Sequence, residues 1–396
     1  MNYSLSCDTW GTEEVAAIKR VIKSGRYTMG EEVATFEKQF AEFMGVPYAK
    51  MVNSGSSANL LMIGSAIYND SYKLNKGDYV IVPAVSWSTT YFPLQQYGLK
   101  LIFCDVDLHT LNLDIEQVKK AISQYDVAAV LTVNLLGNPS NLEELSEICN
   151  DNNIHLFEDN CESFGAELNG KQAGTWGDMG TFSFFFSHHL QTMEGGMILC
   201  HNEKDAQYID SMRAHGWIRT LPDKNYIHNK TGDPFEDSFR FVLPGYSVRP
   251  LDMSGAIGQA QLAKWPSMMK ERQKNAKYFK KKFEDIVVTQ EENGVSSWFG
   301  FSVICPDINR KIVTDALQAA QVEIRPIVAG NFLRNPVIQY LDYIAVGSLP
   351  NANTIHDQGF FLGNDSIDIK DKIDLAYDVV NDVLKKVKVS DLVINP

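Results

Sequence analysis

Two adjacent histidines, His188 and His189, stand in a loop directly after an apolar segment of the chain. Histidine has an ordinary pKa of about 6.5, which suits proton transfer near neutral pH. A loop histidine taken alone is more often a surface residue, and no H-E-x-x-H motif or companion ligand cluster indicates a metal here. The two histidines are therefore candidates for acid–base chemistry that need support from other residues.

A carboxylate at the end of a predicted strand is the second candidate. Asp159 follows the apolar run Ile154–Phe157, and Glu162 lies three residues further on. Ligand sites of α/β proteins form at the carboxyl ends of parallel strands. An aspartate there could hold the protonated ring nitrogen of a pyridine cofactor, or it could be a solvated strand end.

The run Asn53–Asn59, NSGSSAN, precedes the apolar helical stretch LLMIGSAI and is the third candidate. Small residues with hydroxyls at the start of a helix present free N–H groups and the positive end of the helix dipole, which together can bind a phosphate. The same residues would serve equally well as an ordinary N-cap. The residues alone leave both interpretations open.

Alternating apolar and helix-like segments predict the scaffold that positions these candidates. Buried strands are predicted at 79–83, 101–104, 127–133, 154–157, 181–186 and 197–200, with helices such as 115–125 and 141–152 between them. Strand–helix alternation is typical of a largely parallel sheet with helices on both faces. Only the histidine loop separates the last two runs, so we expect them to be neighbouring strands.

The pattern changes after a long helical region at Leu251–Phe283, which is rich in Ala, Gln, Lys and Met. Beyond it, 296–304 and 322–326 are strand-like and 310–320 is helical. We therefore predict a large α/β domain at 1–264, which includes an N-terminal segment, and a smaller α+β domain at 265–396.

Composition narrows the class of protein. The 396 residues carry a net charge of −13, which disfavours binding of nucleic acid through its phosphates. No apolar run approaches the ~20 residues of a membrane span, and the polar, acidic start has no signal-peptide pattern. Six scattered cysteines form no C-x-x-C motif, so we expect no zinc or other metal site and no iron–sulfur cluster. We expect a cytoplasmic protein that does not bind membranes.

In this order, the motifs resemble the sugar aminotransferase family, fold-type I enzymes that use pyridoxal 5′-phosphate (PLP) on nucleotide-linked keto-sugars. The resemblance runs from about Met29 to Leu262 and is looser towards the C-terminus. It implies a large, mostly parallel sheet of the seven-stranded type and a smaller α+β domain. It also implies a homodimer in which both subunits build each active site.

The resemblance assigns a cofactor role to the residues at matching positions. Trp87, in VPAVSWSTT, would stack on the pyridine ring, and Asp159 would pair with the ring nitrogen. Glu162, where the family more often has Gln, would lie near the ring hydroxyl. The residues that would hold the phosphate are Gly55, Ser56, Ser57, Ser183 and Ser247, the last reaching the neighbouring subunit's site at a position where the family usually has Asn. The residues that would contact the sugar nucleotide or an amino-acid carboxylate are Arg26, Tyr27, Thr28, Met29, His215, Arg219 and Arg249.

The catalytic lysine of the family falls on His188, five residues beyond Ser183. That lysine binds the cofactor as a Schiff base, which histidine cannot form, whereas an imidazole can act as a general base. The family branch with histidine at this position consists of sugar 3-dehydratases, and the scattered cysteines make this chain similar to the members without an iron–sulfur cluster. His189 is expected to be structural.

We therefore predict C3 dehydration of a nucleotide-linked 4-keto-6-deoxy sugar, GDP-linked deoxymannose or a related heptose by resemblance. PLP would first take an amino group from L-glutamate to give pyridoxamine 5′-phosphate (PMP), and ammonia and 2-oxoglutarate would be released. Two alternatives stay open: an aminotransferase that tolerates His188, and a non-catalytic sugar-nucleotide-binding relative.

Overall fold

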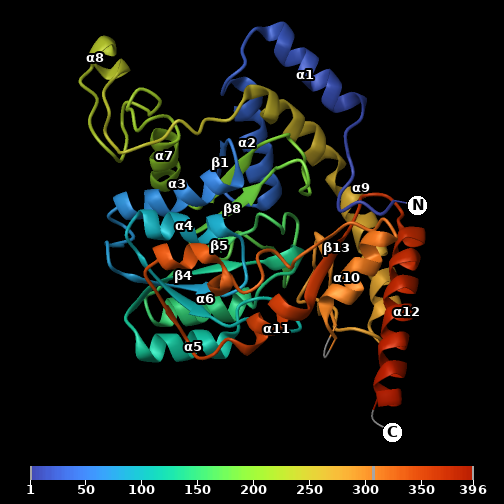
Figure 1. Ribbon diagram of the computed structural model, residues 1–396. Helices are drawn as coiled ribbons and strands as arrows, with labels where there is room; N and C mark the ends of the chain where they lie inside the picture. Colours follow the sequence, from blue (N-terminus) through green and yellow to red (C-terminus); the bar gives the residue numbers. More distant parts are fainter. Residues whose placement is uncertain (1, 306–307, 395–396) are drawn as a thin grey trace.

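The computed structural model describes residues 2–305 and 308–394, in which a large sheet and a smaller one lie side by side (Figure 1). In spatial order, the large sheet consists of β1 (Tyr48–Val52), β9 (Gly196–Cys200), β8 (Met179–Ser183), β5 (His155–Asp159), β4 (Val127–Val133), β2 (Tyr79–Pro83), β3 (Lys100–Cys104) and β12 (Tyr343–Ala345). Strands from β8 to β12 run parallel, whereas β9 is antiparallel to β1 and β8. The predicted α/β class with a mostly parallel sheet is confirmed, and β12 adds an edge strand from the C-terminal part.

Most predicted strands of this sheet match, and the differences have local causes. β8 and β9 are neighbours, as predicted, but β8 ends at Ser183. Phe185 and Phe186 are 46% and 44% exposed, so the prediction of a buried strand up to Phe186 is wrong. The chain turns there, with the N–H of His188 donating to the carbonyl of Phe185 at 2.8 Å. An apolar run therefore continues past the strand into the loop.

Helices cover both faces of the large sheet because side chains alternate along each strand. The covering helices are α2 (Glu31–Met44), α3 (Gly55–Tyr68), α4 (Ser88–Gln96), α5 (Ile115–Gln124), α6 (Leu142–Asp151) and α7 (Glu203–Met212). On β2, Val80 and Val82 pack in the core with α3, α4 and α7, whereas Ile81 packs with α5 and α6. At the β1 end, Phe36 and Phe40 of α2 pack against β8 and β9.

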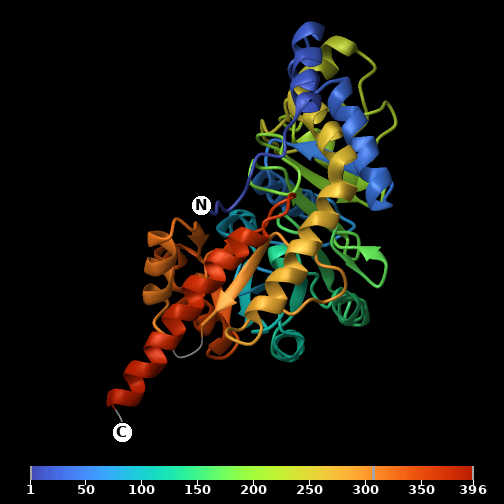
Figure 2. The ribbon, with the colours of Figure 1, turned by 90° about the vertical axis from the view of Figure 1, so that its right-hand side faces the viewer.

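The C-terminal part has its own core around a three-stranded antiparallel sheet of order β10-β13-β11 (Figure 2). Its elements are β10 (Gly300–Ile304), α10 (Arg310–Ala319), β11 (Ile324–Arg325), α11 (Pro350–Gln358), β13 (Gly359–Gly363) and α12 (Lys370–Ile394). The strand predicted at 296–304 begins only at Gly300, because Trp298 takes a left-handed backbone conformation with φ 50°. The strand predicted at 322–326 is confined to Ile324–Arg325.

Helix α9 (Asp252–Phe283) joins the two cores (Figure 2). Its residue Trp265 packs in the core beneath β8 and β9, whereas Phe279 and Phe283 pack in the C-terminal core. The long helix predicted at 251–283 is confirmed to within one residue. The domain boundary predicted at 264/265 falls inside this continuous helix and stays a prediction.

Smaller elements complete the described part of the chain. They are α1 (Thr12–Ser24), α8 (Pro234–Ser238), the two-stranded sheet of β6 (Glu167–Leu168) and β7 (Lys171–Gln172), and the 3-10 turns Leu135–Gly137, Phe332–Arg334 and Pro336–Tyr340. Within residues 2–305 and 308–394, none of the helices combines the length and the apolar character that a membrane span requires.

Candidate active site

The strands that carry the candidate residues end at one edge of the large sheet. β1, β5 and β8 point the same way, because β9 is antiparallel to both β1 and β8. Gly196 of β9 pairs with both Val52 and Ser183, and Thr181 pairs with Asp159. Three candidate segments therefore meet at this carboxyl edge. They are the run Asn53–Asn59 after β1, which we call the phosphate seat, Asp159 at the end of β5, and the loop after β8 that carries His188.

Asp159 is buried, with 4% of its surface exposed, and sits in a hydrogen-bond network. Its Oδ2 accepts hydrogen bonds from Asn59 Nδ2 and Thr90 Oγ1, each at 2.8 Å, and its Oδ1 accepts one from the N–H of Cys161 at 3.1 Å. Thr181 Oγ1 donates to Asn59 Oδ1 at 2.6 Å, which turns the amide nitrogen towards Asp159. A carboxylate has about four acceptor positions, so one stays open for a further donor.

Asn59 lies within the candidate run 53–59 and Thr90 ends the segment VPAVSWSTT, but neither was assigned a role from the sequence. Their contacts with Asp159 span 100 and 69 residues of chain. The only signal was a polar residue at the apolar start of each helix, which is also the ordinary pattern of a helix terminus.

Helix α3 begins at Gly55 with Ser54 as its N-cap, whose Oγ accepts a hydrogen bond from the N–H of Ser57 at 3.1 Å. Ser54 is therefore the N-cap of α3, which is compatible with both interpretations of this run. The first-turn N–H groups of Gly55 and Ser56 have no acceptor within the helix and lie at its positive end. Ser56 Oγ is 2.8 Å from Thr89 Oγ1, which ties this turn to α4.

The helix start is pressed against the strand that precedes the histidine loop. A Cβ atom on Gly55 would lie 2.5 Å from Ser183 Cβ and 2.8 Å from the Cys161 sulfur, so this approach requires glycine. The structure thus brings together Gly55 and Ser183, two of the residues predicted to hold one phosphate.

His188 lies beside these residues with its ring packed between two aromatic side chains. Its ring centroid is 6.0 Å from that of Phe185 and 5.2 Å from that of Phe299, with interplanar angles of 89° and 79°. Burial lowers the pKa of His188 to about 4, although the backbone of Cys161 and of Ser183 and the charge of Asp159 favour the protonated form. Nδ1 is buried and has no hydrogen-bond partner. The imidazole is therefore neutral at pH 7 and keeps an unshared nitrogen.

His189 is buried in the core. Its Nε2 lies 3.2 Å from the carbonyl of Ser297, and because a carbonyl only accepts, Nε2 carries the proton. Its ring also packs edge-on against Trp265, with centroids 5.3 Å apart. Burial, together with the charge of Arg272, holds the pKa of His189 well below its ordinary value. These contacts support the structural role that we expected.

Glu162 and Trp87 lie on loops at the same edge. Glu162 Oε2 accepts a hydrogen bond from the N–H of Leu136 at 3.1 Å. Burial, with a contribution from the charge of Asp159, raises the pKa of Glu162 to about 7, against the effect of that hydrogen bond. Trp87 precedes α4 two residues before Thr89, and its side chain is 59% exposed, so its ring face is available for stacking.

The predicted substrate residues near the end of α7 gather around Trp217. The guanidinium carbon of Arg219 lies 3.3 Å from the Trp217 ring centroid, that of Arg249 lies 5.5 Å from it, and the His215 ring centroid lies 4.9 Å from it. Ser247 forms a β-bridge with Ala214 beside this cluster. In the part of the chain that the structure describes, neither arginine forms an ion pair, so both positive charges are available to an anion.

The other predicted substrate residues lie along the segment that leads into α9. Thr28 forms a β-bridge with Leu251, the N–H of Met29 donates to the carbonyl of Pro250 at 3.2 Å, and Arg26 Nη2 donates to the carbonyl of Met29 at 3.4 Å. The neighbouring Tyr27 side chain is exposed.

The carbonyl of Val248 accepts a hydrogen bond from the N–H of Asn53 at 3.0 Å. This bond places Ser247 and Arg249, the neighbours of Val248, next to the start of the run Asn53–Asn59. Among the described residues, no hydrogen bond, ion pair or ring contact directly links Arg26–Met29, the Trp217 cluster or Ser247 to His188 within one chain.

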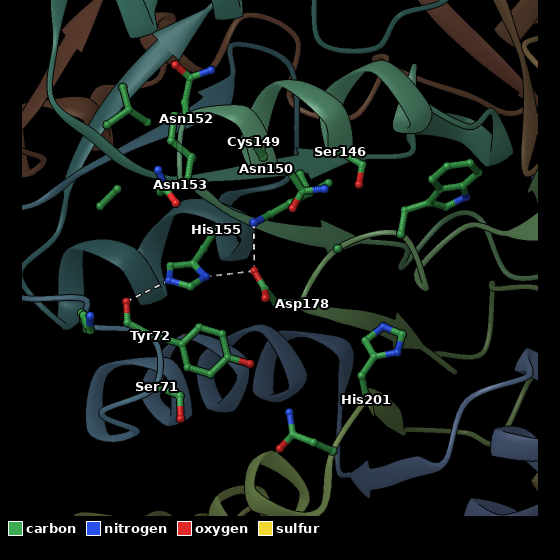
Figure 3. Close-up of a pocket in the computed structure, with 18 of the residues that line it drawn as sticks. Ser71, Tyr72, Ser146, Cys149, Asn150, Asn152, Asn153, His155, Asp178 and His201 are labelled. Atoms are coloured by element: carbon green, nitrogen blue, oxygen red, sulfur yellow. Dashed lines mark hydrogen bonds and ion pairs between the residues drawn. The ribbon is translucent and has the colours of Figure 1, made fainter.

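The opposite, amino edge of the sheet has a cavity of about 700 Å³ (Figure 3). His155, at the start of β5, lies there with Nδ1 3.1 Å from Asp178 Oδ2 and Nε2 2.9 Å from the carbonyl of Tyr72. The hydrogen bond to Asp178 raises the pKa of His155. None of the predicted site residues lines this cavity, and ligand sites of parallel sheets form at the other edge.

The sheet order and the residues that meet at its carboxyl edge define the class of protein. The chain belongs to the DegT/DnrJ/EryC1/StrS aminotransferase family, whose model matches residues 8–374. The family that the sequence motifs predicted is thereby confirmed.

Relatives within this family are similar over nearly the whole chain. GDP-4-keto-6-deoxy-D-mannose 3-dehydratase of Yersinia pseudotuberculosis is 50% identical, over 96% of this chain and 98% of the relative. The solved structure of the E. coli enzyme of that name with bound hydrated PLP is 51% identical, with a TM-score of 0.93, over 96% of this chain and 99% of that one. A structure of GDP-4-keto-6-deoxymannose-3-dehydratase with a trapped PLP–glutamate geminal diamine is 50% identical, with a TM-score of 0.93, over 96% and 100% of the two chains.

The residues at the carboxyl edge fit PLP. Asp159 keeps an open acceptor position for a ring N–H, and the first turn of α3 presents N–H groups beside the close contact of Gly55 with Ser183. Trp87 supplies an exposed aromatic face. Over residues 2–305 and 308–394, no three His, Cys, Asp or Glu side chains are grouped so that they could hold a metal ion.

Proposed function

We propose that this chain is a PLP-dependent 3-dehydratase that removes the C3 hydroxyl group of a nucleotide-linked 4-keto-6-deoxy sugar. The substrate is GDP-4-keto-6-deoxy-D-mannose or a related heptose, and L-glutamate supplies the amino group. The products are the 4-keto-3,6-dideoxy sugar, 2-oxoglutarate and ammonia. The observation that carries the proposal is His188, a neutral imidazole with a free nitrogen where the family has its lysine. The relatives named above support the same substrate class.

The ring of the cofactor is held by three side chains in this proposal. When bound in its amine form, PMP, the cofactor supplies the amino group that joins the sugar at C4 and the electron sink that lets the C3 hydroxyl leave. Asp159, already aligned by Asn59 and Thr90, keeps the ring nitrogen protonated. Trp87 stacks on the ring, and Glu162 lies near its hydroxyl group.

The phosphate of the cofactor is held at the start of α3. The N–H groups of Gly55 and Ser56 and the hydroxyls of Ser57 and Ser183 surround this position, with the positive end of the helix directed at the anion. Ser247 of the partner subunit takes the place of the family's Asn and contributes its hydroxyl.

His188 moves the proton. Because its pKa is about 4, the ring is unprotonated at neutral pH and accepts a proton from the cofactor carbon that bears the amino group. Phe185 and Phe299 pack around the ring and limit the access of water. No lysine occupies this loop, so the amino group is not passed to a covalent acceptor on the protein.

Two arginines that form no ion pair within the described part of the chain bind the sugar nucleotide. Arg219 and Arg249 stack around Trp217, which leaves their N–H groups free for a diphosphate or a substrate carboxylate. His215 and the segment Arg26–Met29 lie beside the same region. These residues serve the active site of the partner subunit in a homodimer, and the protein acts in the cytoplasm.

Product analysis tests this function. The protein is incubated with PLP, L-glutamate and GDP-4-keto-6-deoxymannose, and the nucleotide sugar is analysed by mass. We expect a product with one oxygen atom fewer and equal amounts of ammonia and 2-oxoglutarate, none of which forms without glutamate. An amino sugar would indicate an aminotransferase, and unchanged sugar a binding protein.

Borohydride reduction of the PLP-loaded protein is the companion test. We expect no covalently fixed cofactor, because the loop offers no lysine to PLP. A reduced adduct on a lysine would contradict the role given to His188.

A further inference from the structure

A turn in the C-terminal part, Ser296–Phe299, lies directly against the histidine loop. The ring of Phe299 has its centroid 5.2 Å from that of His188 and 5.5 Å from that of His189. The carbonyl of Ser297 in the same turn accepts the hydrogen bond from His189 Nε2. A segment more than 100 residues away in sequence therefore contacts both histidines.

Arg272 of α9 holds this turn from the inside. Its guanidinium donates to three successive carbonyls, those of Ser297 at 3.4 Å, Trp298 at 3.0 Å and Phe299 at 2.9 Å. Arg272 is buried and forms no ion pair in the described part of the chain, and burial lowers its pKa to about 10. The charge of Asp365 partly opposes this lowering. A buried charge is costly unless it is hydrogen-bonded, so the planar guanidinium and the three carbonyls constrain one another.

The other side of the turn is tied to the large sheet. The N–H of Ser297 donates to the carbonyl of Gly137 at 2.8 Å, and the N–H of Phe299 donates to that of Leu136 at 2.9 Å. Gly137 has φ 91°, and a Cβ atom there would lie 2.5 Å from the nitrogen of Trp298, so the contact needs glycine. Leu136 in turn donates its own N–H to Glu162.

Few other contacts orient the ring of His188. Its Nδ1 has no hydrogen-bond partner, whereas a catalytic imidazole is often aligned by a carboxylate on its second nitrogen. Besides the backbone of Cys161 and of Ser183, which acts on the ring, the packing of the two aromatic rings orients it. Phe185 is on the loop itself and is nearly half exposed, whereas Phe299 is nearer to the ring and belongs to the turn that Arg272 and Gly137 hold.

We propose that Phe299 is a positioning residue that fixes the imidazole plane of His188, and that Arg272 acts through it by holding the turn. The proposal rests on the function proposed above, because it assumes that His188 transfers the proton. In this proposal, a residue of the C-terminal part orients the catalytic base. A proton-transferring group displaced by about 1 Å can lose on the order of 100-fold in rate.

Steady-state kinetics of ring variants form the first test. Phe299→Leu keeps an apolar side chain but removes the ring, and we expect kcat for deoxygenation to fall by roughly 10- to 100-fold with KM changed by less than about twofold. Phe299→Tyr keeps the ring and should restore most of kcat. Phe361→Leu is the matched control, because Phe361 has its ring 6.4 Å from that of Phe299 and has no recorded ring contact with either histidine.

Arg272→Lys keeps the charge but not the planar fork, and we expect its kcat to fall in the same direction as that of Phe299→Leu. If Arg272→Lys does not fold, the Phe299 variants carry the test alone.

A second readout needs neither cofactor nor sugar. Diethyl pyrocarbonate acylates neutral imidazole, and the rate at His188 is followed by peptide mass spectrometry between pH 5 and pH 8. The titratable groups that act on this ring or neighbour it are Asp159 and His189, and Arg272 acts on His189. In the unchanged protein we expect a flat profile, because a ring with a pKa of about 4 is neutral throughout. In Phe299→Leu, water reaches the ring, and the rate should fall as the pH drops below the ordinary value of about 6.5.

Two results would overturn the proposal: wild-type kcat in Phe299→Leu, or an acylation profile that matches that of the unchanged protein. An equal loss of kcat in Phe361→Leu would also overturn it, because the effect would then be general packing. If the unchanged protein forms no deoxygenated sugar, the proposed function fails, while the acylation profiles still decide whether Phe299 positions the ring.

Discussion

The two edges of the large sheet place a histidine in opposite environments. At the amino edge, His155 has partners on both ring nitrogens, and the hydrogen bond to Asp178 raises its pKa (Figure 3). At the carboxyl edge, His188 packs between aromatic rings, leaves Nδ1 without a partner, and has a pKa lowered to about 4. A histidine whose nitrogens are both occupied contributes to the fold, whereas one with a free nitrogen can exchange a proton with a ligand.

The aspartates of the two edges differ in the same way. Asp178 accepts from His155 and from the N–H of Leu156, so both partners belong to the sheet itself. Asp159 is aligned by Asn59 and Thr90 and keeps an acceptor position. Paired substitutions, one at each edge, can test whether the two edges differ in activity, PLP affinity and pH-dependent stability.

The largest effect is expected for His188→Asn. A positioned acid–base group contributes on the order of 10²- to 10⁴-fold, so ammonia release should fall by that factor while PLP absorbance on binding persists. His155→Asn, at the other edge, should change the rate by less than about twofold. Equal losses in the two variants would mean that the edges do not differ in function.

Asp159→Asn should have the next largest effect. A hydrogen bond to a charged group is worth roughly 1.5–3 kcal/mol, so the affinity for PLP should fall by about 10- to 100-fold in a spectroscopic titration. Asp178→Asn removes the partner of His155 and should leave PLP affinity unchanged. If Asp159→Asn keeps its full affinity for PLP, another residue must contact the pyridine nitrogen of the cofactor.

Gly55→Ala should weaken PLP binding by about tenfold, since overpacking costs roughly 1–3 kcal/mol. The new Cβ atom must displace Ser183 Cβ, 2.5 Å away, and so disturb the phosphate seat. Ser71→Ala, in the amino-edge cavity, is the control and should bind PLP normally. Unchanged affinity in Gly55→Ala would show that the cofactor phosphate does not sit at the start of α3.

The smallest expected effects are changes in stability with pH, and they have opposite signs. The raised pKa of His155 gives stability that is present below about pH 6.5 and is lost as the pH rises through the folded-state pKa. The lowered pKa of His188 means that the unfolded chain binds more protons between about pH 4 and 6.5, so this group costs stability as the pH falls through that range.

Denaturant unfolding of the cofactor-free variants at about pH 5.5 and 8 measures how His155 and His188 each contribute to the free energy of unfolding. Relative to the unchanged protein, His155→Asn should be more destabilised at the lower pH, and His188→Asn should be more stable there than at the higher pH. The same sign in both variants would contradict the contrast between the edges.

The apolar runs predicted most of the large sheet, and β2 and β4 have the predicted bounds. β1 was not predicted, because Lys50 interrupts its apolar run. In the fold, Lys50 Nζ pairs with Asp210 at 2.6 Å, a partner that local pattern cannot reveal. β12 has only three residues and pairs with β3 from the C-terminal part, so its existence depends on how the two cores pack.

The sequence predicted several individual residues of the candidate site but not the contacts that orient them. Gly55, Asp159 and Ser183 were identified from motifs, and the strand directions bring them together. Asn59 and Phe299 were not, because an amide in a helix and a phenylalanine in a turn have no special local signature.

The sequence by itself determined which chemistry is possible at position 188. Histidine has no primary amine, so the residue type alone excludes the Schiff base that the family's lysine forms with the cofactor. Only the tertiary structure decided that His188 lies at the carboxyl edge as a neutral imidazole with a free Nδ1, whereas both nitrogens of His155 are occupied and Nε2 of His189 is bound to Ser297. The reason is physical: a pKa depends on burial and on neighbouring charges, and residues as distant in sequence as Asp159 and Phe299 supply them.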